Sequence, residues 1–216
     1  MDRIDSLQIG WDGPWSRIQL GDNDPRLERI VGQLGLFGGA RHWWLERRSL
    51  VFLPQAHLLR AVLVETTGRC RRFGIENASE LVRLSDERSY EEAMRIGGAM
   101  VCADSAEDIV RFYFHRRLFP EMRVHLVERA ADLAWWGWTA PPEQLRAVDA
   151  LARPLVTAAS DGGFRFAATV KIGRDLLASE IALAADGRVS IAPLATLVAD
   201  LACVQGRWYD PARDSC

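Results

Sequence analysis

The chain has 216 residues, of which 49% are hydrophobic and 26% charged, and a formal net charge of −2. A chain of this length and composition can build a globular core without metal or disulfide staples, either as one large domain or as two small lobes. The charge excludes a general electrostatic attraction to nucleic acid or to an anionic membrane surface.

The four cysteines (Cys70, Cys102, Cys203 and Cys216) are scattered and show no C-x-x-C spacing. The first residues are acidic and lack the apolar segment of a signal peptide, and no apolar run approaches the ~18 residues of a membrane span. We therefore expect a cytoplasmic chain with reduced thiols, no membrane partner, and cysteines that fill the core as small hydrophobic residues.

The first two dozen residues contain the turn-forming stretches "WDGPW" and "GDNDP", which predict an irregular or short-stranded entry. Asp24 before Pro25 is typical of an N-cap followed by proline at the first helical position. A helix is expected to follow, since apolar residues recur at helical spacing and a glycine pair ends the pattern. These residues are Leu27, Ile30, Val31, Leu34, Gly38 and Gly39.

An extended region comes next. Residues 42–47 and 49–53 are rich in β-favouring side chains, and Pro54 ends the second run. Residues 58–73 predict a hairpin with its turn at Thr66 to Gly68. Residues 79–84 are compatible with a short strand or a helical turn.

Two capping boxes are predicted in the middle of the chain, one pairing Ser89 with Glu92 and the other Ser105 with Asp108. The first opens a short helix that ends at a glycine pair, residues 97–98. The second opens a helix over 106–119, which Pro120 stops. Two strands, 123–129 and 133–138, are expected to follow.

Pro141 and Pro142 predict the start of another helix, whose apolar stripe runs from Leu145 to Ala159 with a kink or break at Pro154. After a turn at 161–163, three strands form a predicted meander, with Asp186-Gly187 as the strongest hairpin turn. These strands cover residues 164–172, 176–184 and 188–191.

The two parts of the chain share a weak internal sequence similarity. When Gly68 is aligned with Gly187, Leu58 matches Leu177 and Val62 matches Ile181. Two interpretations stay open, a duplicated helix-plus-meander half and a chance likeness of two hairpins. Both predict an α+β fold in which antiparallel sheets are packed by helices. The expected halves are 1–138 and 139–216, unless the chain forms one compact domain.

The residues that could carry chemistry form no recognised motif. None of the four histidines (His42, His57, His115 and His125) has a second ligand at metal-binding spacing, so we expect no metal site. No serine or cysteine lies in a nucleophile motif, and no glycine-rich loop matches a nucleotide-binding pattern, so we expect no cofactor. The weak acid–base candidates are His115, His125 and Glu128.

Four glutamates fall on predicted strands: Glu46, Glu65, Glu128 and Glu180. Each has an arginine close by in the sequence. A general acid or base in an enclosed pocket and an ordinary cross-strand ion pair both explain such a glutamate, and the ion pair is the more economical interpretation.

The chain has 8 Trp and only 3 Tyr, an inversion of the usual order. Adjacent tryptophans on a strand point to opposite faces, so a core explains only one of each pair unless both faces are covered. The other Trp can anchor a partner, because aromatic residues are enriched at interfaces. The candidate partner-binding residues are Trp43, Trp44, Trp135, Trp136 and Trp138, together with Arg69, Arg71 and Arg72, which suit a carboxylate, phosphate or acidic peptide.

These observations predict a non-catalytic binding or accessory protein that recognises a peptide or protein partner, such as the recognition subunit of an enzyme complex. Strand addition to an open sheet edge is one way to bind such a partner. The alternative is a small enzyme or ligand-binding protein with an apolar, Trp-lined cavity and a His/Glu acid–base pair. Nucleic-acid binding through the arginine cluster is the least favoured of the three.

Overall fold

The computed structural model describes residues 15–21, 23–36, 42–65, 68–115, 118–133, 141–160 and 163–203. The chain divides into two compact units between Met100 and Val101. The boundary expected at 138/139 therefore falls inside the second unit. Each unit contains an antiparallel five-stranded sheet and two helices among the described residues, which confirms the α+β class.

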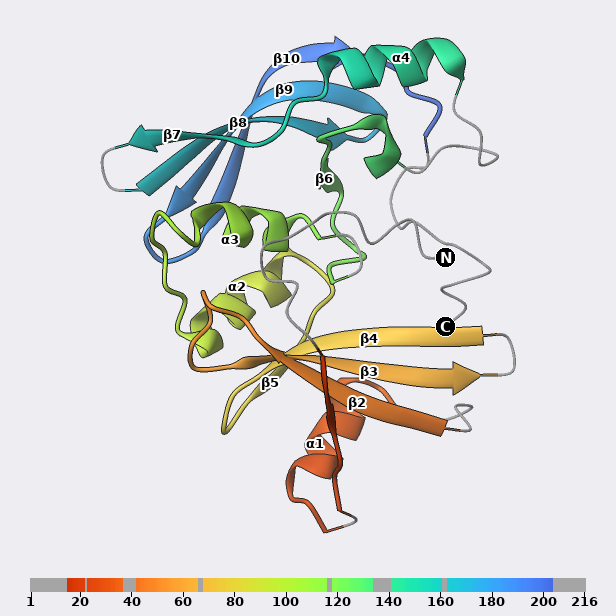
Figure 1. The fold of residues 1–216 in the computed structure, drawn as a ribbon, viewed down its shortest axis with the longest axis vertical. Coiled ribbons are helices and arrows are strands. Elements are labelled where there is room, and N and C mark those ends of the chain that lie inside the picture. The colour runs from red at the N-terminus through yellow and green to blue at the C-terminus, as the bar shows by residue number, and fades with distance from the viewer. Residues whose placement is uncertain are drawn as a thin grey trace. The chain divides into compact units, whose positions relative to one another are not determined.

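The first unit is a continuous meander (Figure 1). Its five strands lie in the order β1-β2-β3-β4-β5, and every neighbouring pair is antiparallel. The predicted hairpin is confirmed as β3 and β4, and residues 79–84 contain a short strand. The elements are β1 (Ser16–Ile18), α1 (Arg26–Gln33), β2 (His42–Ser49), β3 (His57–Glu65), β4 (Gly68–Glu76), β5 (Leu81–Arg83) and α2 (Glu87–Gly97).

Helix α1 packs on one face of this sheet. The Asp24 carboxylate accepts a hydrogen bond of 2.9 Å from the backbone N–H of Arg26, which satisfies one of the free donors at the start of the helix. The helix then buries Ile30 and Leu34 in a core that includes Leu45 and Leu59 from the central strands. Burial of this apolar stripe fixes α1 to its face of the sheet.

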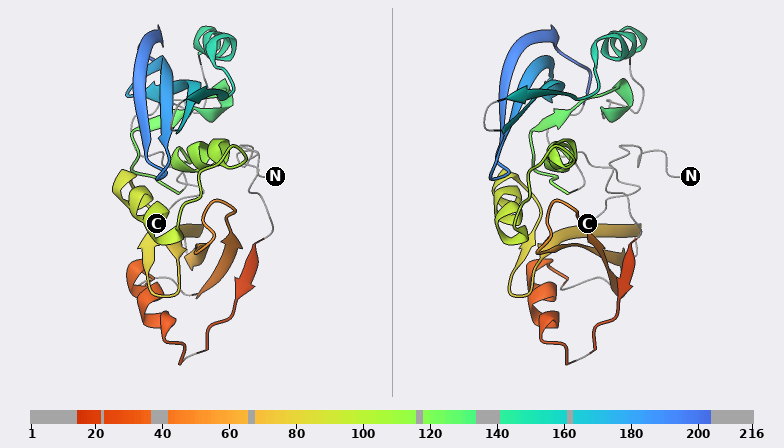
Figure 2. Two further views of the ribbon diagram at one scale, coloured as in Figure 1. Left: turned by 90° about the vertical axis from the view of Figure 1, so that its left-hand side faces the viewer. Right: turned by 60° about the vertical axis from the view of Figure 1, so that its left-hand side comes forward.

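Helix α2 lies on the other side of the sheet from α1 (Figures 1 and 2). Its N-cap is Asp86, whose side chain accepts from the backbone N–H of Ser89 at 2.8 Å, while the Ser89 hydroxyl accepts from the backbone N–H of Asp86 at 3.0 Å. The predicted box of Ser89 with Glu92 is therefore wrong by one helical turn. Both Asp and Ser are good caps, and Asp86 reaches the first free N–H groups.

The second unit contains a sheet in the order β10-β9-β8-β6, with β7 also paired to β8. All four of these pairings are antiparallel. The elements are α3 (Ala106–Tyr113), β6 (Val124–Leu126), a 3-10 turn η1 (Ala130–Asp132), α4 (Pro142–Leu151), β7 (Val156–Ser160), β8 (Gly163–Ile172), β9 (Asp175–Ala184) and β10 (Val189–Val198).

Two helices in this unit are shorter than their sequence patterns predict. Helix α3 ends at Tyr113 rather than Phe119, and the buried residues Phe114, Leu118 and Phe119 follow it outside the helix. The Ser105 side chain also makes no cap hydrogen bond to α3, so the second predicted capping box is wrong.

Helix α4 ends at Leu151, since Pro154 lacks an N–H and disfavours helical geometry in the residue before it. The predicted break is therefore confirmed, and residues 156–160 form β7 instead of a second helical piece. The turn at Asp186-Gly187 is also confirmed, with Gly187 at a φ of 86° that favours glycine.

Both units place a helix ahead of an antiparallel meander. Helix α1 precedes β2, β3 and β4, and α4 precedes β8, β9 and β10 in the same order. The internal sequence similarity predicts this order. A common origin of the two units stays a hypothesis.

Candidate partner-binding face

The two faces of the first sheet differ in chemistry. Alternation sends Trp43 and Leu45 toward α1, and it sends Trp44 and Glu46 to the opposite face. Cross-strand register then places further side chains on that opposite face, because residues directly opposite in an antiparallel pair share a face. The same side of the sheet also carries the buried apolar residues Leu58, Val62 and Ile75. We call its charged and aromatic part the Arg–Trp face, which consists of Trp15, Arg17, Trp44, Glu46, Arg48, Arg60, Arg71 and Phe73.

Guanidinium groups stack on the two tryptophans of this face. The central guanidinium carbons of Arg48 and Arg60 lie 4.6 and 4.1 Å from the ring centroid of Trp15. The same carbon of Arg17 lies 5.5 Å from the centroid of Trp44. These distances are within the range of cation–π attraction, so the stacking orders the arginine side chains on the sheet.

Glu46 occupies the middle of the Arg–Trp face. Its Oε1 accepts a hydrogen bond of 3.1 Å from the indole Nε1 of Trp44, and its Oε2 accepts one of 2.6 Å from Nε of Arg60. The Nη2 atom of Arg60 completes an ion pair with the same oxygen. This confirms the cross-strand ion-pair interpretation for Glu46, which lies directly opposite Arg60.

The surroundings of Glu46 stabilise its charged form. Burial raises the pKa of the carboxyl, but the hydrogen bonds from Trp44 and Arg60 and the positive charges of Arg60 and Arg71 outweigh it. The net effect is a pKa below the ordinary value. The face therefore binds a carboxylate of its own chain in the ionised state.

The arginines of the face differ in their exposure and in their ion pairs. Arg48 is buried, and the Arg60 side chain is 22% exposed in its pair with Glu46. Arg17 and Arg71 are exposed, and neither makes an ion pair with a residue of the described ranges. Their charges are thus available to a molecule outside the chain.

The structure separates the predicted partner-binding residues. Trp44 and Arg71 lie on the Arg–Trp face. Trp43 packs instead against the core beneath α1. Arg72 also points to the α1 side, where its guanidinium donates to the carbonyls of Leu34 (2.8 Å) and Gly35 at the end of that helix. Arg72 is therefore a structural anchor, because it satisfies carbonyls that the helix leaves free.

Other candidates cannot be placed. The backbone of Arg69 pairs with Val64 in the β3–β4 hairpin, but its side chain lies outside the described part of the structure. Trp135, Trp136 and Trp138 also lie outside the described residues.

Sequence analysis alone missed Trp15, Arg17, Arg48 and Arg60. The available signal was the register of the strands, since alternation along β2 places Arg48 on the face of Trp44. Arg17 comes from β1, a strand of three residues whose pairing with β2 no sequence pattern specified, and Trp15 directly precedes that strand.

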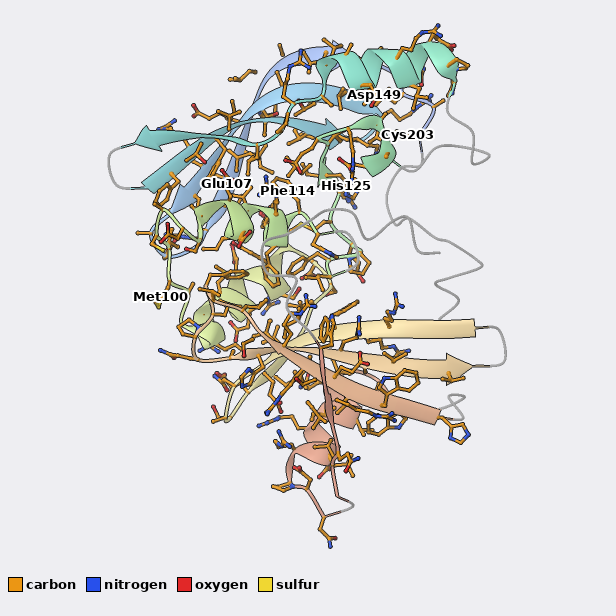
Figure 3. All side chains as sticks on the ribbon, in the orientation of Figure 1. Met100, Glu107, Phe114, His125, Asp149 and Cys203 are labelled. Atoms are coloured by element: carbon orange, nitrogen blue, oxygen red, sulfur yellow. The ribbon has the colours of Figure 1, made fainter. Side chains whose placement is uncertain are left out.

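The weak acid–base candidates lie in the second unit, where Figure 3 labels His125. Glu128 forms an ion pair with Arg111 of α3 at 3.3 Å and accepts a hydrogen bond of 3.1 Å from the backbone N–H of Leu155. His125 is buried on β6, directly opposite Lys171 of β8, whereas His115 follows α3. Glu128 thus fixes α3 to neighbouring segments of its own unit, which accounts for its position without catalysis.

The cysteines differ from one another. Cys70 is disulfide-bonded, so the expectation of reduced thiols is wrong for this residue. Cys102 and Cys203 are free. Hydrogen bonding from Ser105 lowers the pKa of the exposed Cys102 thiol, whereas burial raises the pKa of the Cys203 thiol.

Over the residues that the structure describes, no three His, Cys, Asp or Glu side chains gather as a metal site would require. The helices in those ranges are all too short or too polar to cross a membrane. In comparisons with known proteins, the chain matches no family model, no curated protein and no solved structure.

Proposed function

We propose that the protein is a non-catalytic binding or accessory protein that recognises a peptide or protein partner through the Arg–Trp face. The observation that carries this proposal is the face itself. Arginines and tryptophans are the residues most enriched among binding hot spots, and here they are gathered on one sheet face, with Arg17 and Arg71 exposed. In this role the chain would serve as a recognition subunit beside a separate enzyme.

The arrangement suits binding better than reaction. Each of the stacked arginines is held by an indole ring, which limits the rotamer entropy that a partner must remove when it binds. The carboxylate of the face is ionised and hydrogen-bonded at both oxygens, so it is a poor proton donor or acceptor near neutral pH. An ordered, cationic and aromatic surface of this kind favours partner recognition.

The test is a selection of random displayed peptides on the purified full chain. We expect the wild type to enrich a set of peptides that the double variant R17E/R71E no longer retains. The matched control is R47E/R83E, which reverses two exposed arginines on the α1 side of the same sheet and changes the net charge equally. It should retain the wild-type set, and circular dichroism should show all three proteins folded.

Two results would overturn the proposal. One is a wild type that enriches no peptide. The other is an R17E/R71E variant that enriches the same peptides as the wild type while R47E/R83E behaves identically.

A further inference from the structure

The Arg–Trp face already contains a complete binding arrangement for one carboxylate. The indole N–H of Trp44 donates to one oxygen of Glu46, Oε1, and two nitrogens of Arg60 contact the other, Oε2. These donors fix the orientation of the carboxylate, and the bonds from Arg60 are assisted by opposite charge. The chain thus shows, with its own Glu46 side chain, that these donors bind a carboxylate.

Glu46 does not neutralise its surroundings. Arg60 pairs with Glu46, while Arg17 and Arg71 of the same face are exposed and form no ion pair with a described residue. Arg71 is close enough to contribute to the lowered pKa of Glu46. The excess positive charge favours an anionic partner, because opposite charges across an interface are complementary.

The ion pair of Glu46 is partly exposed. The Glu46 side chain is 19% exposed, and Arg60 is similarly accessible. A partly exposed ion pair between two side chains contributes little net free energy, since solvent screens it and both side chains lose rotamer freedom. A competing carboxylate from outside the chain therefore faces a small barrier in free energy.

Building on the proposed function, we infer that the partner is an acidic polypeptide segment, and that one of its carboxylates replaces Glu46 on Trp44 and Arg60. Glu46 then acts as an internal competitor that sets the affinity of the face. Arg17 and Arg71 at the exposed margin bind neighbouring carboxylates of the same segment. A nucleic acid fits less well, because the whole chain has a net charge of −2 and would repel a long phosphate backbone beyond this one face.

The experiment uses fluorescence anisotropy with three labelled probes and the full chain. The probes are an alternating Glu-Ser peptide, the matched Gln-Ser peptide and an oligouridine of similar length. We expect the wild type to bind the Glu-Ser peptide more tightly than the other two, with an affinity that falls as salt is added. The variant E46Q should bind this peptide about threefold to fivefold more tightly, because it removes the competing charge and keeps the side-chain shape.

The matched control is E180Q in the second sheet. Glu180 also lies on a strand and pairs with an arginine of the neighbouring strand, Arg165. Its substitution should leave the affinity for the Glu-Ser peptide unchanged. Unfolding curves for both variants should show that each is folded under the conditions of the binding assay.

The possible results separate this inference from the proposed function. If E46Q binds the Glu-Ser peptide no more tightly than the wild type does, the competitor role of Glu46 is wrong, although partner binding through the face still stands. Equal binding of the Glu-Ser and Gln-Ser peptides, or preferred binding of oligouridine, overturns the acidic partner. If E180Q tightens binding as much as E46Q does, the effect is one of net charge and the inference also fails.

Discussion

Trp43 and Trp44 are neighbours of the same residue type on the same strand, yet they belong to different parts of the molecule. Trp43 packs on the core beneath α1, whereas Trp44 hydrogen-bonds Glu46 and lies beneath Arg17 on the Arg–Trp face. The α1 face is apolar toward the middle of the sheet, and the Arg–Trp face is cationic. The two faces should therefore respond to substitution in different ways, the first through stability and the second through binding.

The largest effect is expected from Leu59→Ala on the α1 face. Leu59 is fully buried in the core of the first unit, so its truncation should lower the free energy of unfolding by about 2–5 kcal/mol through lost burial and a residual cavity. Urea unfolding would measure this value. Any loss of peptide binding should follow the folded fraction alone. Weaker binding by fully folded Leu59→Ala would contradict the expectation that the α1 face affects only stability.

Alternation, which requires only that residues 42–47 form a strand, predicts that adjacent tryptophans point to opposite faces. The sequence cannot say which of the two is buried, because that depends on where α1 docks. The role of Arg72 depends on the position of α1 for the same reason. No sequence pattern pairs its guanidinium with a partner, but α1 places the carbonyls of Leu34 and Gly35 within hydrogen-bonding distance.

The Arg–Trp face is built from residues that are distant in sequence, which is why only part of it was predicted. Trp15 stacks with Arg60 across a separation that only strand pairing removes. Local signals were more reliable where they depend on one residue, as at Gly187 and Pro154. They failed where two good caps compete, since Asp86 rather than Ser89 begins α2.

A smaller effect is expected from a pair of glutamate substitutions that compares the faces directly. Glu76 is buried on the α1 face at the end of β4, where it pairs with Arg29 at 3.1 Å and with Arg26 at 3.8 Å. Glu76→Gln should lower the free energy of unfolding by about 1–3 kcal/mol, because two arginines of α1 lose a charged acceptor that is itself buried. Glu46→Gln should cost on the order of 1 kcal/mol or less, since its carboxylate is more exposed than that of Glu76.

Chemical denaturation of the two single variants would measure this difference under identical conditions. Equal losses would mean that Glu46 contributes to the fold as much as Glu76 does. Such a result would also argue against a carboxylate that a partner displaces.

The smallest effect is the pH dependence that Glu46 confers on stability. Its pKa in the folded protein lies below the ordinary value of 4.5, because hydrogen bonds from Trp44 and Arg60 and the charges of Arg60 and Arg71 favour the ionised form. As the pH falls, the unfolded chain therefore takes up its proton first. The stabilisation is complete above the unfolded pKa and is lost as the pH falls through the lower folded pKa.

The wild type and Glu46→Gln isolate this contribution, because every other titrating group is common to both proteins. Their difference in free energy of unfolding should be constant near neutral pH and should shrink as the pH falls below the ordinary carboxyl pKa of 4.5. Urea unfolding at a series of pH values provides the measurement. A difference that stays constant to the lowest pH, or that grows there, would show that the face does not hold Glu46 in its ionised state, and the carboxylate site would lose its physical basis.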